Sequence, residues 1–227
     1  MGRLYQYSKK IWSKNRSFTF LLVVLTIYIF VVIPFLVENH LSKILFLFFY
    51  YALLTSSINY LLDKNQHIIL TGLVVFPLLF LLLEFYFESV WIEVFTDLFI
   101  VIYCLVLCYV ILAKTFEKGK IDIRRVQGAV IVYLLSGLIF CLVYHIIFKL
   151  SPVKSFSVVP GSLRKEFLYF SFVTLTTVGY GDIVPLTAVA RSTANLEALI
   201  GQLYPAILIA RLVSMEVSEK KSGHGHE

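Results

Sequence analysis

Charged side chains are scarce in this sequence. Only 15% of its 227 residues are Asp, Glu, Lys or Arg, whereas 59% are hydrophobic and the mean hydropathy is +0.86. Soluble globular domains carry about 25% charged and about 45–50% apolar residues. The apolar residues also come in long blocks, and about 20 of them in a row can span a bilayer as a helix. The composition therefore excludes a soluble domain and predicts a polytopic membrane protein.

Cysteine is also rare. The three cysteines, Cys104, Cys108 and Cys141, lie inside apolar blocks, without the spacing of zinc ligands or of a disulfide framework. We therefore expect no metal site of that kind and no organic cofactor. The net charge of +6 does not indicate nucleic acid, because the basic residues flank apolar blocks, as residues that set membrane topology do.

The sequence lacks the pattern of a cleavable leader. Residues 1–16 are basic and fairly polar, and the apolar run that follows is long enough to span, so we interpret it as a retained first span. Leu4, Tyr7 and Ile11 would share one face of a helix. Residues 1–16 are therefore either a helix on the inner membrane surface or a frayed basic leader. The tail, 214–227, is short and polar, and no soluble regulatory domain is evident.

Six apolar blocks are long enough to span a bilayer. A bilayer offers no water to free backbone groups, so each block is expected to be a helix. A shorter segment, 164–176, cannot span and is expected to re-enter the membrane from one side. The expected fold is all-α, with six transmembrane helices and a re-entrant helix; the six blocks are 17–37, 41–62, 67–87, 90–113, 126–148 and 188–213.

Charge orients these spans. Residues 1–16 and the linker 114–125 are basic, whereas the connection between the third and fourth spans carries four acidic residues and no Lys or Arg. Positively charged loops stay in the cytoplasm. Both termini are therefore expected inside and 149–187 outside, in a bacterial inner (plasma) membrane, although 149–187 has basic residues of its own.

The most informative residues are Thr174-Leu-Thr-Thr-Val-Gly-Tyr-Gly-Asp182, between the fifth and sixth spans. Gly-Tyr-Gly alone is typical of any turn. Joined to Thr-Thr-Val and flanked by two spans, it resembles the filter signature T-V-G-Y-G of the potassium channel family, and the likeness extends through Asp182 and Pro185. The unit 126–213 has the family's spacing, while 1–113 is similar only in topology.

This resemblance implies a selectivity filter at residues 177–181. Rings of backbone carbonyls, one from each of four chains, can replace the water around a cation. Gly179 and Gly181 accept left-handed dihedrals, which lets consecutive carbonyls turn to one side. Val178 and Tyr180 would point outward onto the pore helix, and the Thr177 hydroxyl would add the innermost oxygens. We therefore expect a homotetramer that holds potassium at Thr177, Val178, Gly179 and Tyr180 and conducts it passively.

The residues around the filter depart from the family pattern. Many members have two tryptophans in the pore helix, where this chain has Tyr169 and Phe170. Tyr169 is expected to hydrogen-bond Asp182, and Phe170 to pack on Tyr180, with Thr176 as a further supporting residue. A looser support would affect the stability of the filter more than its selectivity.

Glu197 stands inside the last span. An ionisable group in a span is energetically costly and is a functional candidate by default. It is expected behind the filter, where it would accept hydrogen bonds from Thr174, Thr176 or a neighbouring subunit. Two roles remain open, a structural anchor and a gating or proton-sensing group.

Gly201 and Pro205 follow on the same span. Gly201 lies at the position of the gating hinge in simple two-span potassium channels, and Pro205 removes a helical hydrogen bond one turn later. Gly201 either permits bending or allows close helix packing. At 3–4 spacing, three further residues are expected to line the cavity below the filter: Gln202, Ala206 and Ile209.

Basic residues are missing from the fourth span. Six-span potassium channels commonly carry them at every third position, but 90–113 has none. We therefore interpret 17–113 as a four-helix peripheral domain without an arginine-rich voltage sensor. Glu93 and Asp97 are expected to be solvated at the outer end, and His145 and Lys149 to lie at the membrane interface.

Two other functions were weighed. Ion-uptake subunits and weakly selective cation channels usually carry four degenerate pore loops in one chain, whereas this chain has one intact loop. An intramembrane serine protease needs a G-x-S-G site and a facing histidine. The most similar segment, Leu134-Leu-Ser-Gly137, lacks the first glycine of that site. His145 lies on the same helix as Ser136 and does not face it from another. The chain is not expected to be an enzyme; its expected partners are potassium ions, lipids and copies of itself.

Overall fold

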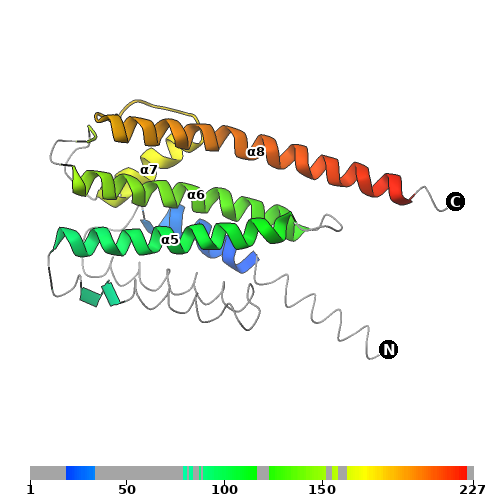
Figure 1. The fold of residues 1–227 in the computed structure, drawn as a ribbon, viewed down its shortest axis with the longest axis horizontal. Helices are drawn as coiled ribbons and strands as arrows, with labels where there is room; N and C mark the ends of the chain where they lie inside the picture. The colour runs from blue at the N-terminus through cyan, green and yellow to red at the C-terminus, as the bar shows by residue number, and fades with distance from the viewer. Residues whose placement is uncertain are drawn as a thin grey trace.

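The computed structural model describes residues 19–33, 79–80, 82–83, 87, 89–116, 123–151, 155–157 and 163–223, and this part of the chain is mostly helical (Figure 1). The first helix, Thr19–Val32, ends in the π-helical segment η1, Tyr28–Val32. Four named α-helices follow: α5 (Val90–Thr115), α6 (Ile123–Leu150), α7 (Leu163–Leu175) and α8 (Ala188–Gly223). The described ranges contain no β-strand, and Phe156 and Pro185 form an isolated bridge.

Two of the described helices, α5 and α6, are long and apolar enough to cross a membrane. With 26 residues, α5 is about 39 Å long at 1.5 Å per residue. The predicted spans 90–113 and 126–148 lie within these two helices, and the re-entrant segment predicted at 164–176 corresponds to α7. The span at 41–62 and nearly all of the span at 67–87 lie outside the described residues, so six spans remain a prediction.

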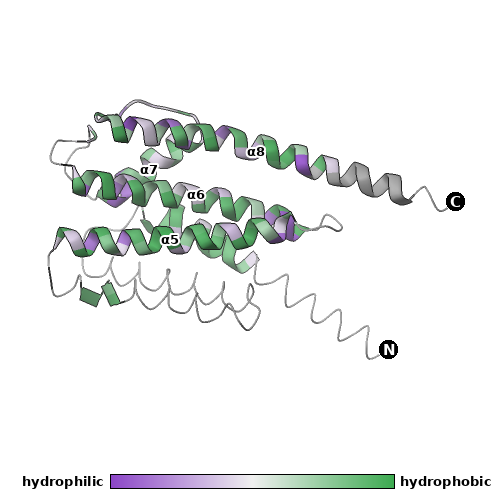
Figure 2. Ribbon diagram, in the orientation of Figure 1, coloured by the Kyte–Doolittle hydropathy of each residue, from purple (hydrophilic) through white to green (hydrophobic). Residues whose placement is uncertain are grey.

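The helices α5 and α6 lie side by side and antiparallel, and α8 begins at the end of the bundle where α6 stops (Figure 1). Figure 2 shows hydrophobic residues along most of these helices and a hydrophilic cluster where α5 ends and α6 begins. That cluster contains Lys114, Arg124 and Arg125. The described part of the linker is therefore basic, which is typical of a cytoplasmic end.

The first helix packs on the other described helices. Leu25 and Ile29 are buried in one hydrophobic cluster with residues of α5, α6 and α7. The ring centroids of Phe30 and Phe172 are 5.5 Å apart, and Gln127 Nε2 of α6 donates to Thr19 Oγ1 at 3.0 Å. Residues 19–33 and the pore helix thus share a core within one chain.

At the opposite end of the bundle, Asp97 is fully buried, and the prediction that it is solvated is wrong. Its Oδ1 lies 3.0 Å from Arg164 Nη2 at the start of α7, and its Oδ2 lies 2.5 Å from His145 Nδ1 on α6. The placement of His145 at the membrane interface is also wrong, because its side chain is buried against this carboxyl group. A buried charge is tolerated where it is paired and hydrogen-bonded, as here.

Nearby, Lys149 Nζ lies 2.6 Å from Glu93 Oε2. Both side chains are partly exposed, as expected at an interface. The N-terminal part of α5 is therefore joined to α6 by two polar contacts, at Asp97 and Glu93, and to α7 by one.

Candidate functional site

The segment 177–181, called the filter segment below, follows directly after α7. Every second residue in it has a left-handed backbone: φ is 61° at Thr177, 60° at Gly179 and 79° at Gly181. The two glycines were expected to adopt this conformation. Thr177 was not, and a non-glycine residue held there stores strain of about 1–3 kcal/mol. The surrounding contacts must therefore hold this segment in place.

Hydrogen bonds from the filter segment to the end of α7 supply that restraint. Val178 N donates to Val173 O at 2.9 Å, and Gly179 N donates to the same oxygen at 3.3 Å. In a trans peptide the carbonyl points opposite to the N–H of the next residue. The carbonyl oxygens of Thr177 and Val178 therefore both point away from α7. The local geometry places consecutive backbone oxygens on one free side of the segment.

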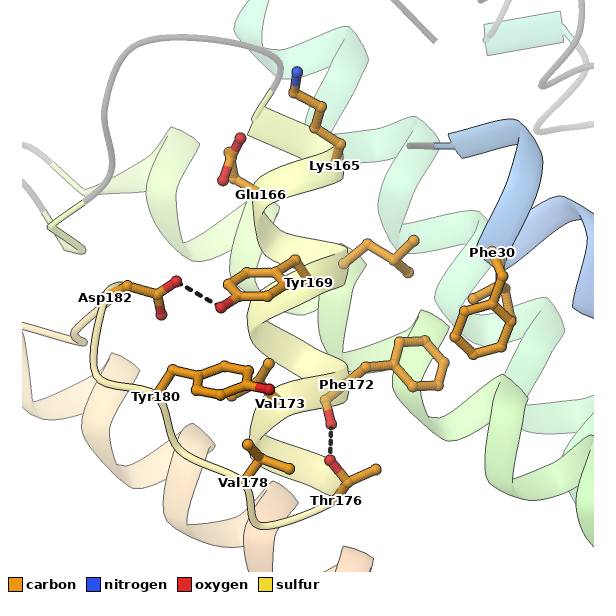
Figure 3. Close-up of a pocket in the computed structure, with 12 residues that line it drawn as sticks. Phe30, Lys165, Glu166, Tyr169, Phe172, Val173, Thr176, Val178, Tyr180 and Asp182 are labelled. Atoms are coloured by element: carbon orange, nitrogen blue, oxygen red, sulfur yellow. Dashed lines mark hydrogen bonds between the residues drawn. The ribbon is translucent and has the colours of Figure 1, made fainter. Parts of the chain in front are cut away.

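Within one chain, the filter segment is uncovered, because each of its residues is exposed. Val178 is 54% exposed and Tyr180 is 71% exposed. A Cβ built on Gly179 would meet no atom within 4 Å. Between the filter segment, α7 and the first helix lies a pocket of about 790 Å³, whose lining includes Phe30, Phe172 and Val178 (Figure 3). A single chain thus leaves both its free carbonyls and these side chains uncovered.

The predicted hydrogen bond between Tyr169 and Asp182 is present. Tyr169 Oη donates to Asp182 Oδ2 at 2.6 Å, and its ring stacks on that of Tyr180 with 6.4 Å between centroids and 4° between planes (Figure 3). This hydrogen bond, helped by one from Ile183 N, lowers the pKa of Asp182 below its usual value. Asp182 is therefore held in its ionised form just after the filter segment.

Replacing Tyr169 by phenylalanine is expected to raise the pH at which Asp182 takes up a proton. A lowered pKa means that the tyrosine bond is present at neutral pH and is lost as the pH falls through that lowered pKa. Without the phenol, the pKa of Asp182 returns toward its ordinary value, so its carboxylate should be lost at a higher pH than in the wild type. Infrared titration of the carboxylate band during acidification checks this. Tyr109→Phe, on the exposed face of α5, is the matched control, and overlapping pH profiles for Tyr169→Phe and wild type would contradict the role.

Thr176 Oγ1 donates to Phe172 O of α7 at 2.6 Å, and its support of the filter segment stays a prediction. Phe170 does not occupy its expected place against Tyr180. Its ring centroid lies 5.0 Å from Tyr144 and 5.6 Å from Phe156. Helical geometry explains the difference, because adjacent residues of a helix do not share a face. Tyr169 contacts the filter segment, and the next residue faces the core behind α7.

The segment around Phe156 links the loop before α7 to the chain after the filter segment. Ser157 N donates to Val184 O at 2.9 Å, and Leu186 N donates to Ser155 O at 2.7 Å. Sequence reasoning missed this contact, because Phe156 lies in a loop with no recognisable motif. The only signal for this contact in the sequence was the aromatic side chain of Phe156.

Glu197 is fully buried and lies against α7, as predicted. Its partners differ from those expected. Ser171 Oγ of α7 lies 2.5 Å from Glu197 Oε1, and Tyr144 Oη of α6 hydrogen-bonds Oε2. Neither Thr174 nor Thr176 forms a hydrogen bond with Glu197. Sequence reasoning missed Ser171 and Tyr144, because they face Glu197 only after three helices have packed together.

The backbone of α8 touches the end of α7 at Gly201. A Cβ at this position would lie 1.9 Å from Leu175 O, a distance that no structure tolerates. Close helix packing is therefore one role of Gly201. α8 is continuous through Pro205, and bending there remains a prediction. The predicted cavity-lining residues are all exposed within one chain: Gln202, Ala206 and Ile209.

The residues weighed for serine protease chemistry are engaged elsewhere. Ser136 Oγ donates to Tyr133 O of its own helix at 2.6 Å, and His145 contacts Asp97 at 2.5 Å. Neither side chain is available to the other as nucleophile or base. The geometry at this place is that of a packed helix.

Comparisons with known proteins confirm the resemblance found in the sequence. Residues 131–218 match the family described as "Ion channel". Protein LctB of Bacillus caldotenax is 40% identical over 88 residues, which are 36% of this chain and 64% of that protein. Potassium channel subfamily K member 4 of Rattus norvegicus is 36% identical over 70 residues, 31% of this chain and 18% of that protein.

The inward rectifier potassium channel Kirbac3.1 of Paramagnetospirillum magnetotacticum is 34% identical over 90 residues, 38% of this chain and 30% of that protein. The chain therefore spans less than two thirds of the length of each of these relatives. No solved structure matches it. The matched region, 131–218, holds most of α6, all of α7, the filter segment and most of α8.

Proposed function

We propose that this chain, whose residues 131–218 match the ion channel family, is the subunit of a potassium-selective channel that conducts passively. One observation carries the proposal: left-handed residues alternate along the filter segment, and its N–H groups bond to α7 while its carbonyls point to the open side. A ring of such carbonyls can replace the hydration shell of potassium. Two of the three relatives named above are potassium channels by name.

The proposed assembly is a homotetramer. One chain supplies a single row of carbonyls, and a potassium filter takes four such rows around an axis. A closed symmetric oligomer brings identical open faces together, and the exposed Tyr180 and the exposed face of α8 would be covered there. Potassium would bind at the levels of Thr177, Val178, Gly179 and Tyr180. Bacterial inner-membrane placement with cytoplasmic termini is part of the same proposal.

Potassium should carry nearly all of the current. The filter segment matches the T-V-G-Y-G signature without substitution, so sodium is not expected to replace potassium at the carbonyl sites. Purified protein in planar bilayers, with potassium on one side and sodium on the other, gives a direct measurement. The reversal potential should be displaced strongly in the direction of potassium selectivity. A reversal near zero would instead favour the weakly selective cation channel.

Steep voltage gating by a charged helix is not expected. One elementary charge gains about 2.3 kcal/mol per 100 mV, and steep gating takes roughly three to four charges per subunit. In α5 the first basic residue is Lys114, in its last turn. The buried Asp97 and the ion pair at Glu93 also fasten the outer half of α5 to its neighbours.

Voltage steps with gating-current recording test this expectation. The open probability should change shallowly, with little charge movement that precedes opening. A steep curve with several gating charges per subunit would contradict it. The corresponding control is a solution free of sodium and potassium. There, any shallow voltage dependence that is caused by permeating ions disappears, whereas the movement of true gating charge persists.

A further inference from the structure

A buried cluster of oxygen atoms joins three helices behind the filter segment. It comprises the carboxyl group of Glu197 on α8, the hydroxyl groups of Ser171 on α7 and Tyr144 on α6, and the backbone carbonyl of Gly137 on α6. Ser171 Oγ lies 2.5 Å from Glu197 Oε1 and 2.7 Å from Gly137 O, and Tyr144 Oη hydrogen-bonds Glu197 Oε2. These are three oxygen–oxygen contacts of hydrogen-bond length.

Each of these contacts needs a hydrogen atom between its oxygens. Ser171 and Tyr144 have one hydroxyl hydrogen each, and the Gly137 carbonyl has none. If Glu197 is ionised, two hydrogens must serve three contacts. Ser171 would then face two acceptors, and one buried pair of oxygens within 2.7 Å would meet with no hydrogen between them. Such an unsatisfied buried contact is strongly unfavourable.

A neutral carboxylic acid supplies the missing hydrogen. With its proton on Oε1, Glu197 donates to Ser171 Oγ, Ser171 donates to Gly137 O, and Tyr144 donates to Oε2. A proton on Oε2 would not suffice, because Ser171 would again face two acceptors. One arrangement therefore satisfies every oxygen in the cluster.

Besides the hydroxyl groups of Ser171 and Tyr144, no group that faces Glu197 favours a carboxylate charge. The titratable groups that face Glu197 are weak acids of α6, namely Tyr133, Cys141 and Tyr144, and α7 contributes the uncharged Ser171. Glu93 and Asp97 form ion pairs, whereas Glu197 has no ion pair with another described residue. A lone charge at a buried position is costly and is relieved by binding a proton.

We propose that Glu197 is held as a neutral acid whose proton bonds to Ser171, so that it acts as a positioning residue tying α8 to the pore helix and, through Ser171, to α6. Ser171 lies two residues before Val173, whose carbonyl accepts the N–H groups of Val178 and Gly179. The tie therefore holds the part of α7 that fixes the filter segment. Raising the pH removes the proton and breaks this tie, so the support weakens on the alkaline side.

Infrared spectroscopy of the purified tetramer tests the protonation state without any current. At neutral pH the wild type should show a carboxylic acid C=O band that shifts in D2O and is missing from Glu197→Gln. Ser171→Ala should move the same band, because its hydrogen-bond partner is gone, which keeps the test valid if Glu197→Gln does not fold. Glu166→Gln, a carboxyl of α7 outside the cluster, should leave the band unchanged. Absence of an acid band in the wild type at neutral pH, with a carboxylate band lost in Glu197→Gln, would overturn the proposal.

Recordings at increasing pH test the consequence, and only this part depends on the proposed channel function. Glutamine has a donor and an acceptor placed like those of the neutral acid, so Glu197→Gln should conduct at neutral pH. The wild type should lose open probability at alkaline pH, and Glu197→Gln should resist that loss. An alkaline loss that is identical in both would contradict the positioning role. If no chain conducts at any pH while the acid band is present, the proposed function fails and the protonation state stands.

Discussion

Replacing Gly179 by alanine is expected to abolish potassium current while the protein still folds and assembles. The residue has φ of 60°, and an L-residue in the left-handed region costs about 1–2 kcal/mol. The added Cβ would meet no atom of its own chain within 4 Å, so the strain is local. The filter segment can relieve it by turning a peptide plane, which moves a carbonyl out of the row that faces potassium.

Two measurements separate conduction from assembly for this variant. The mass of the particle in detergent should equal that of the wild-type tetramer, and bilayer recordings should show no potassium current. Val178→Ala is the matched control, because it shortens a neighbouring side chain without a positive φ, and it should still conduct. Wild-type current in Gly179→Ala would show that the filter segment does not conduct through its carbonyls.

Replacing Gly201 by alanine is expected to prevent stable assembly. Its Cβ would lie 1.9 Å from Leu175 O and 2.7 Å from Leu175 C, which are backbone atoms at the end of α7. Backbone atoms cannot turn aside as a side chain does, so α8 must move away from α7. Overpacking of this kind lowers the stability of the folded protein by about 1–3 kcal/mol or more. Here it disrupts the contact between α8 and the end of α7, which precedes the filter segment. Thermal unfolding and the yield of tetramer in detergent measure the loss.

Two further variants help to distinguish a packing role of Gly201 from a hinge role. Gly137→Ala also introduces a clash, 2.8 Å from Phe172 Cζ, but a ring can rotate away, so its effect should be smaller. Pro205→Ala restores a helical N–H without any clash and should assemble normally. If Gly201→Ala also assembles normally and changes only the open probability, Gly201 acts as a hinge and the packing role is wrong.

The longer elements followed from the sequence because their cause is local. A block of apolar residues bounded by charges predicts a membrane helix, and α5 and α6 lie where the blocks at 90–113 and 126–148 placed them. The conformation of the filter segment could also be predicted, because the glycines at 179 and 181 indicate a left-handed backbone there. The positive φ of Thr177 was not, since threonine is compatible with every ordinary conformation.

Contacts between helices could not be predicted in the same way. The sequence identifies three ionisable residues in or near apolar blocks: Asp97, His145 and Glu197. It does not show which helix packs against each of them. An interfacial position and a buried pair give the same sequence signal, so Asp97 and His145 were misplaced. Gly201 was ambiguous for a related reason, because both a bend and a close approach select glycine.

The buried contact between Asp97 and the residues Arg164 and His145 limits how this protein can be divided or recombined. Arg164 and His145 lie within 131–218, the part that matches the ion channel family, whereas Asp97 belongs to α5, outside it. Excising the matched part as a minimal pore would take an acidic partner away from a guanidinium group at the head of the pore helix. Grafting it onto the peripheral helices of another channel would do the same, unless that channel offers a carboxylate at the same height. The natural unit of exchange in a chimaera therefore begins at α5, about forty residues before the boundary that sequence similarity alone would suggest.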